Sequence, residues 1–197
     1  MSARLLVSLK AEWFQRFDKI LFHNETFSPS NLKCLELCEA HCCPHAKMLQ
    51  MPLGEIASPI VVLLPFEMEY LVERLGASRA SFRIWPLDLT SELRIEIGMF
   101  DLGKPCPFIE NDRICTIHTH KPLDCRTFPL LPSLNSSHEL EWLLCESCPS
   151  LDFLNPAFSE QIKHIWQDVA PALPRAWWDF YAFADHWTGC PQPEARN

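Results

Sequence analysis

The sequence predicts an α+β fold: a small cysteine-rich, metal-stapled domain with mixed short strands and a helical C-terminal extension. Three observations predict this class. Apolar residues follow helical spacing near the N-terminus and form strand-length runs further along. Nine of the ten cysteines fall between residues 34 and 148. Beyond them the composition changes, and four tryptophans fall between residues 156 and 187.

These changes divide the chain into three parts. Residues 1–33 are expected to form an N-terminal helix and loop, residues 34–148 the cysteine-rich metal-binding domain, and residues 149–197 a helical extension packed on it. In the first part, aromatic and leucine residues at roughly helical spacing predict a helix over residues 11–22.

The middle of the chain opens with a strand and a helix. An apolar run predicts a buried strand over residues 60–64, and Pro65 then starts a helix that ends near residue 75, with Gly76 as its stop. The glutamates of this helix are expected on a solvated face: Glu67, Glu69 and Glu73. Residues 81–85 and 92–97 predict a hairpin, and a short strand is expected over residues 114–117.

The C-terminal extension is expected to form two helices, broken at Pro171 and Pro174. Its tryptophans favour burial in the core, and the alternative is a surface that binds another protein. We therefore expect that any protein partner contacts the Trp-rich C-terminal helices.

Charge and hydropathy exclude two other classes of partner. The net charge of −8 and the lack of a basic run argue against nucleic-acid binding. The longest apolar run, residues 60–66, has the length of a strand and is too short for a membrane helix. No secretory signal is recognised at the N-terminus, so we expect a cytoplasmic protein. In that reducing compartment, thiols favour metal or redox chemistry over structural disulfides.

The nine clustered cysteines are the candidate metal ligands, and they form three groups. The first is Cys34, Cys38, Cys42 and Cys43. The second is Cys106, Cys115 and Cys125. The third is Cys145 and Cys148. A lone cysteine usually packs as a small apolar side chain, which is what we expect of Cys190, but core packing gives no reason for such crowding.

Helical geometry divides the first group. On a helix, Cys34, Cys38 and Cys42 lie at about 0°, 40° and 80°, whereas Cys43 lies at about 180°. One metal cannot easily take all four from an unbroken helix, so either the helix ends near Cys42, as Pro44 favours, or Cys43 has another purpose.

The kind of metal follows from the number and spacing of the thiols. Zinc sites typically use two close cysteine pairs, and this chain has one such pair, Cys145 and Cys148. The gaps of the second group are irregular, and nine thiols exceed the four that one zinc needs. An iron–sulfur cluster of the 4Fe-4S type is therefore favoured, with zinc as the alternative.

Three motifs together resemble the YkgJ-type zinc- or iron-chelating (CxxCxxCC) domain family. They are the first cysteine group, the segment that begins Cys106-Pro107-Phe108, and Cys125-Arg126-Thr127-Phe128-Pro129. The resemblance implies a metal-chelating role, and through flagellin lysine N-methylases it also implies an iron–sulfur cluster or methyl transfer. The gaps of three residues in the first group depart from the family's gaps of two. His118 stands where the family has tyrosine.

Two further interpretations depend on this resemblance. Arg126, directly after Cys125, is a candidate cofactor-binding residue, and the alternative is a surface arginine paired with a carboxylate. His118 and His120 are candidate nitrogen ligands, with a surface or hydrogen-bonding role as the stronger alternative. No catalytic set is recognised outside the cysteines.

Three functions therefore compete. The first is an iron–sulfur protein with a redox or accessory role in a modification pathway. The second is a zinc-stapled protein-interaction module. The third is a protein methylase-like enzyme.

Overall fold

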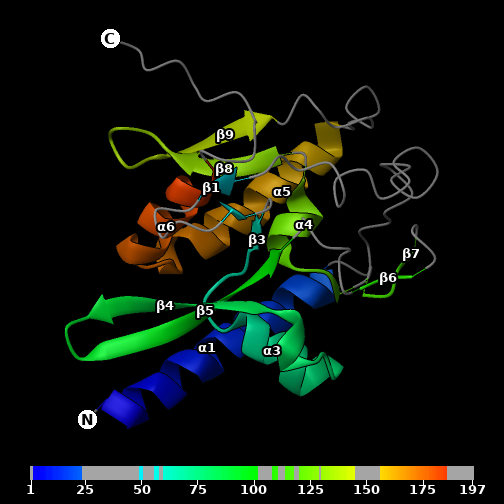
Figure 1. Ribbon diagram of the computed structural model, residues 1–197. Coiled ribbons are helices and arrows are strands. Elements are labelled where there is room, and N and C mark those ends of the chain that lie inside the picture. The colour runs from blue at the N-terminus through cyan, green and yellow to red at the C-terminus, as the bar shows by residue number, and fades with distance from the viewer. Residues whose placement is uncertain are drawn as a thin grey trace.

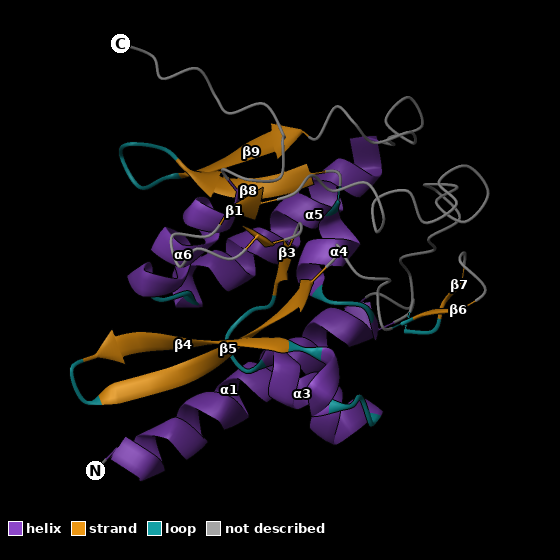
Figure 2. Cartoon of the chain, viewed as in Figure 1, coloured by secondary structure: helices purple, strands orange, loops and turns teal. Residues whose placement is uncertain are grey.

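The structure is a computed structural model in which helices and strands alternate along the chain (Figure 1). It describes residues 2–23, 49–50, 56–57, 60–101, 108–110, 114–117, 120–128, 130–144 and 156–185. The helices, with 3-10 helices marked η, are α1 (Ser2–His23), α3 (Glu67–Leu75), η3 (Arg79–Ser81), α4 (Leu123–Thr127), α5 (Pro156–Val169), η6 (Ala170–Ala172) and α6 (Arg175–Asp185). The strands are β1 (Leu49–Gln50), β2 (Ile56–Ala57), β3 (Ile60–Val62), β4 (Arg83–Thr90), β5 (Leu93–Asp101), β6 (Ile109–Glu110), β7 (Ile114–Cys115), β8 (Leu130–Leu134) and β9 (Leu140–Leu144). The mixture of helices and short strands confirms the α+β class (Figure 2).

The largest sheet among the described residues is antiparallel and has the order β3-β5-β4. β4 and β5 form the predicted hairpin, but the strands are longer and the turn is tighter than expected. β4 continues through Pro86, which lies opposite Glu96. Proline is tolerated there because β4 is an edge strand among the strands that the structure describes, where it is bonded to β5 alone.

The segment from β3 into α3 lies between two apolar clusters. The small cluster consists of Leu63, Met68, Leu71, Phe82, Phe100 and Phe108. The large cluster takes buried side chains from α1, β5, α5, α6 and other elements, among them Trp13, Val62, Ile97, Trp166 and Trp177. Val62 and Leu64 enter the large cluster, whereas Leu63 between them enters the small one. This division explains why the apolar run is continuous rather than alternating with polar residues.

Gly98 allows α3 to lie directly against β5. A Cβ atom at this position would come within 2.7 Å of Met68 Cβ and 2.9 Å of Leu63 Cδ1. Carbon atoms do not pack that closely, and Met68 and Leu63 are both fully buried. The contact between helix and sheet therefore requires glycine at position 98.

α1 begins at Ser2 rather than near residue 11, so the predicted start is wrong. Leu6 and Leu9 in this first part of the helix are partly buried and pack against the large cluster, whereas Leu5 and Val7 between them are 51% and 69% exposed. Further along, Phe17 packs against Tyr70 of α3, with ring centroids 5.2 Å apart. The apolar face of α1 therefore begins before the predicted segment, at Leu6, and continues through it to Phe17.

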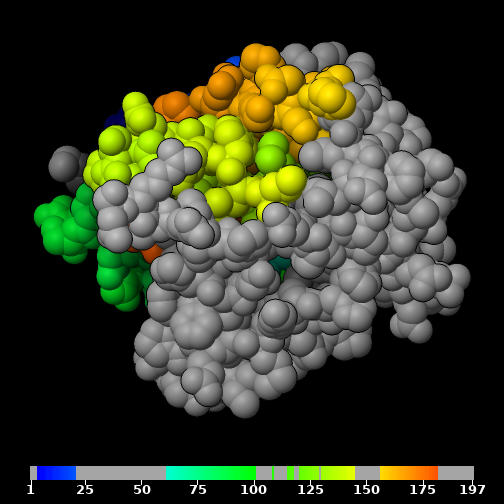
Figure 3. Space-filling model, turned by 90° about the horizontal axis from the view of Figure 1, so that it is seen from above, coloured from blue at the N-terminus to red at the C-terminus, as the bar shows by residue number. Residues whose placement is uncertain are grey.

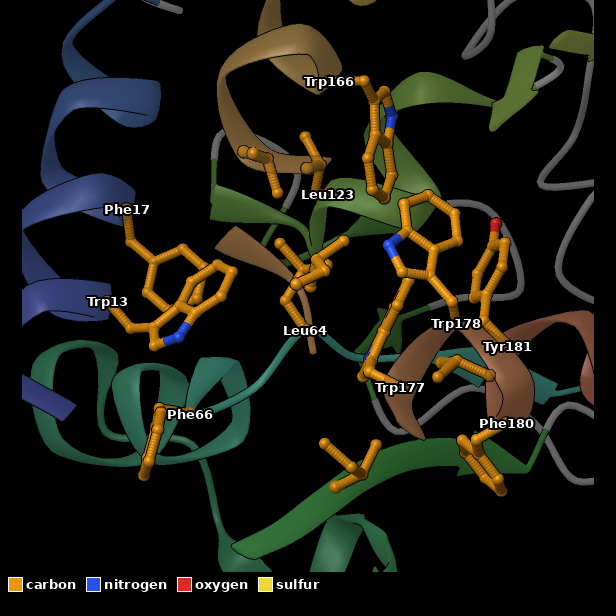
Figure 4. Packing of buried hydrophobic residues seen from close by; sticks show 14 of the residues in the cluster. Trp13, Phe17, Leu64, Phe66, Leu123, Trp166, Trp177, Trp178, Phe180 and Tyr181 are labelled. Atoms are coloured by element: carbon orange, nitrogen blue, oxygen red, sulfur yellow. The ribbon is translucent and has the colours of Figure 1, made fainter. Parts of the chain in front are cut away.

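The two C-terminal helices are confirmed, with η6 at Pro171 between them. Trp166, Trp177 and Trp178 are buried, and Figure 4 shows Leu64 and Leu123 between these tryptophans and the aromatic side chains of α1. Trp187 lies outside the described residues. A protein partner on these helices remains a prediction, and it would have to contact side chains other than the three buried tryptophans.

The hairpin of β8 and β9 is absent from the sequence-based prediction. Its turn is closed by Asn135, whose Oδ1 accepts hydrogen bonds from the amides of Ser137 and Glu139, both at 2.9 Å. Such an Asn-centred turn before the alternating Leu140 and Trp142 is the signal that could have revealed it. In Figure 3 the hairpin, in yellow-green, lies beside α5 on one face of the molecule. Among the described helices, none is long and apolar enough to cross a membrane.

The close approach at Gly98 predicts that Gly98→Ala destabilises the protein. The added methyl group overlaps Met68 Cβ, which cannot move without moving α3. We expect the free energy of unfolding to fall by about 1–3 kcal/mol, measured by urea denaturation. Ser91→Ala, at the exposed hairpin turn, is the control and should change it by less than about 0.5 kcal/mol. Equal stability of the two variants would contradict the packing described here.

Candidate metal centre

α4 is a short helix that carries Cys125 in its middle. Pro122 directly precedes it, and the helix ends at Thr127, followed by the C-cap Phe128 directly before Pro129. Proline disfavours helical backbone in the residue before it, so the sequence itself limits α4 at its C-terminal end. The helix packs beside β3 and β8 (Figure 1).

The buried carboxylate of Glu67 joins two segments that are far apart in the sequence. Its Oε2 accepts a hydrogen bond from the Leu64 amide at 2.9 Å, and its Oε1 accepts one from the Leu123 amide at 2.8 Å. The residue is only 5% exposed. Burial raises the pKa of Glu67 to about 7, although the two amide bonds partly oppose the increase. Because Leu123 is the first residue of α4, Glu67 fixes the N-terminal end of that helix.

The turn before Glu67 is strained. Phe66 has a φ of 62°, in the left-handed region that bulky residues rarely adopt. Its side chain is buried in the large cluster, and its carbonyl accepts a hydrogen bond from the Tyr70 amide at 3.0 Å. Left-handed backbone cannot continue a helix, so α3 begins at Glu67 and not at Pro65 as the sequence predicts.

Asp124 is the second carboxylate that holds α4. Its Oδ1 accepts a hydrogen bond from the Tyr181 hydroxyl at 2.8 Å, and its carboxyl group also accepts one from the Val62 backbone. Burial raises the pKa of Asp124 to about 6, against the effect of these bonds. α4 is therefore tied to β3 and, through Tyr181, to α6.

Arg126 places a cation inside the protein. It is 8% exposed, so the alternative of a surface arginine is wrong. Its Nη2 donates a hydrogen bond to the Lys121 carbonyl at 3.4 Å, and its charge interacts with Glu67 and with Cys125. Burial lowers the pKa of the guanidinium, which nevertheless stays protonated in proteins.

Cys125 is half-buried and packs against the small cluster. It therefore has an apolar wall on one side and the Arg126 cation beside it. A neighbouring cation favours the thiolate, which is the form of cysteine that binds metal.

Cys115 is half-buried in β7, which pairs with β6. The amide and hydroxyl of Thr116 both donate hydrogen bonds to the Phe108 carbonyl, at 2.8 and 3.2 Å, and these bonds close the hairpin. Burial raises the pKa of the Cys115 thiol, while a hydrogen bond from the Ile117 backbone and the charge of Lys121 act in the opposite direction.

The two described cysteines thus share one arrangement. Each is half-buried, and each has a cation from the same short stretch of chain, Lys121 for Cys115 and Arg126 for Cys125. Cysteine sulfur is a soft donor that suits zinc or iron, and a nearby cation offsets part of the charge of a metal-bound thiolate. The chemistry of these donors therefore fits the metals that the sequence predicts.

The other predicted ligands lie outside the described residues. They are Cys34, Cys38, Cys42, Cys43, Cys106, Cys145 and Cys148. His118 and Cys190 lie outside them as well, whereas His120 is described and exposed. Within the part of the chain that the structure describes, no three His, Cys, Asp or Glu side chains gather as a metal-binding group. The complete ligand set therefore stays a prediction.

The predicted solvated face of α3 is wrong for Glu67, and also for Glu69, which is half-buried with a buried Oε2 atom. Glu73 is exposed, with 47% of its side chain accessible, and pairs with Lys10, whereas Glu67 is buried. One signal in the sequence points to this difference, because Phe66 and Met68 flank Glu67 and extend the apolar run on both sides. The supporting roles of Asp124 and Tyr181 have no comparable signal in the sequence.

Fold and site together define a class: an α+β protein with half-buried cysteines that interact with nearby cations, Lys121 for Cys115 and Arg126 for Cys125. The cysteine-rich region, residues 33–149, matches the family model described as "Putative zinc- or iron-chelating domain" (CxxCxxCC). The match covers more than half of the chain, so the protein belongs to this family, as its motifs predict. No curated protein and no solved structure matches the chain significantly. α5 and α6 lie beyond the matched region.

The raised pKa of Glu67 predicts how stability depends on pH. Between its ordinary value of 4.5 and about 7, the folded protein binds a proton at Glu67 that the unfolded chain does not bind. This contribution to stability is complete below about pH 4.5 and is lost as the pH rises through about 7. The charged groups that face Glu67 are Asp124 and Arg126.

We therefore expect Glu67→Gln to flatten the pH profile. Over this window the stability of the wild type should fall relative to the variant by up to about 3 kcal/mol, measured by denaturant unfolding. Ser91→Ala, at the exposed hairpin turn, changes no titratable group and should leave the profile unchanged. Parallel profiles for the wild type and Glu67→Gln would contradict the burial effect.

Proposed function

We propose that this protein binds metal as an iron–sulfur cluster of the 4Fe-4S type, with a redox or accessory role in a modification pathway. The observation that carries the proposal is the position of Cys125, between the small apolar cluster and the Arg126 cation, within the family's cysteine-rich region. Zinc held by the same thiolates is the second candidate, because the family description names both metals.

The proposed ligands are drawn from the nine clustered cysteines. They are Cys34, Cys38, Cys42, Cys43, Cys106, Cys115, Cys125, Cys145 and Cys148. One zinc takes four ligands, so the surplus of thiols supports a cluster or a second site. A bound iron–sulfur cluster would supply one-electron chemistry.

The surroundings of Cys125 and Cys115 suit a cluster. Apolar side chains such as Phe108 limit the access of water, and burial with nearby charge is a main determinant of cluster potential. Arg126 and Lys121 would offset the negative charge of the thiolates and could donate hydrogen bonds to sulfur.

Metal and sulfide analysis after anaerobic purification tests this proposal. We expect a brown protein with broad visible absorption that contains both iron and acid-labile sulfide. Zinc without iron or sulfide would overturn the cluster and support the second candidate. A colourless preparation that neither contains nor binds either metal would overturn metal binding altogether.

The assignment of ligands predicts a graded set of serine variants. Cys42→Ser, Cys115→Ser and Cys125→Ser should each abolish metal content and lower thermal stability, because the metal staples the fold. Cys190→Ser is the matched control and should change neither. Full metal content in Cys125→Ser would show that the second cysteine group is wrongly assigned.

A further inference from the structure

We propose that Glu67 and Tyr181 are positioning residues of the metal centre, which act through α4 to hold Cys125 in place. The inference rests on the proposed function, since it requires Cys125 to be a ligand. It also extends the centre beyond the region that matches the family, because Tyr181 belongs to α6. We call Glu67, Asp124 and Tyr181 the α4 clamp.

α4 needs such support because of its length. A helix of five residues is too short to be stable by itself, so its contacts determine its position. Metal ligands must lie within a few tenths of an ångström of their required distances. A thiolate on α4 can therefore meet that requirement only if other elements fix the helix.

The first arm of the clamp is Glu67. Its carboxylate accepts hydrogen bonds from the Leu123 amide at 2.8 Å and the Leu64 amide at 2.9 Å. These two bonds fix the position of α4 relative to the turn after β3. The strained backbone at Phe66 gives this turn its shape. Strain of this kind persists where the surrounding structure imposes it, and it is common at functional sites.

The second arm is Tyr181, whose hydroxyl donates a hydrogen bond to the carboxylate of Asp124, the residue before Cys125. Tyr181 is 2% exposed and stacks on Trp177, with ring centroids 4.7 Å apart and an interplanar angle of 17°. Trp177 in turn donates its indole N–H to the Leu63 carbonyl at 3.0 Å. The tyrosine hydroxyl is therefore held rigidly, and Figure 4 shows the Trp177 and Tyr181 side chains close together on α6.

Both arms of the clamp are hydrogen-bonded to the same short backbone segment, residues 62–64. The Trp177 indole binds the Leu63 carbonyl, and the Glu67 carboxylate binds the neighbouring Leu64 amide. Asp124 also accepts a hydrogen bond from the Val62 backbone. α4 is thus fixed relative to β3 from two directions, and one of them needs a helix outside the family region.

The chain offers a matched control for the tyrosine. Tyr70 is also buried and also donates its hydroxyl to an aspartate, Asp18, at 2.7 Å. That bond joins α3 to α1 and does not involve α4. Tyr181→Phe and Tyr70→Phe therefore remove the same chemical group and the same kind of hydrogen bond, but only Tyr181→Phe loosens the clamp.

The experiment measures binding of cobalt(II) to the full-length protein by competition with a chelator, together with its visible spectrum. Cobalt(II) is the probe because its thiolate absorption depends on the number and geometry of the ligands. Tyr181→Phe should weaken binding about 10- to 100-fold, the usual effect of removing a group that orients a ligand, and should change the spectrum. Tyr70→Phe should leave both unchanged.

Glu67→Gln tests the other arm, with Glu73→Gln as its control, and should weaken binding by a similar factor. If Glu67→Gln fails to fold, the comparison of Tyr181→Phe with Tyr70→Phe still tests the positioning role, because each of these variants loses a single hydroxyl group. Equal affinities and spectra for Tyr181→Phe and Tyr70→Phe would overturn the inference.

Failure of the inference and failure of the proposed function give different results. A wild type that binds no metal, or a Cys125→Ser variant that binds it fully, contradicts the proposed role of Cys125. A wild type that depends on Cys125 but does not respond to Tyr181→Phe contradicts only the positioning role.

Discussion

The structure depends on one buried carboxylate, that of Glu67, which accepts the amides of Leu64 and Leu123. A carboxylate in an apolar interior is unfavourable unless its oxygens are hydrogen-bonded, and these two amides supply partners for both oxygens. The amide of Leu123 would otherwise be an unsatisfied donor at the start of a buried helix. The hydrogen bond between Leu123 and Glu67 thus satisfies both a buried donor and a buried acceptor, and it joins α3 to α4.

Around this bond, the two apolar clusters give α4 its surroundings. Leu123 is buried in the large cluster, together with the tryptophans of α5 and α6, whereas Cys125 packs against the small cluster. The short helix α4 therefore directs the Leu123 side chain into the large cluster and the Cys125 thiol toward the small cluster. The C-terminal helices contribute to this arrangement although they lie beyond the family match.

The sequence predicted those features that have a local signal. The hairpin of β4 and β5 and the two C-terminal helices have periodic apolar patterns, and their existence is confirmed. The family was recognisable from ordered cysteine motifs, which are confirmed by the match over residues 33–149. Glu67 was predicted wrongly despite its apolar neighbours Phe66 and Met68, because a glutamate in the first turn of a helix usually faces solvent. Its burial depends on Leu123, 56 residues later, and such a tertiary contact leaves no periodic pattern.

The central claim is that the chain itself fixes α4 before any metal binds. Hydrogen exchange of the Leu123 amide in the metal-free protein tests this most directly. The account predicts strong protection, close to that of the Leu63 amide, which is bonded to the Gly98 carbonyl within the sheet region. Exchange of Leu123 as fast as that of the exposed turn residue Ser136, with protection only after metal is added, would contradict it.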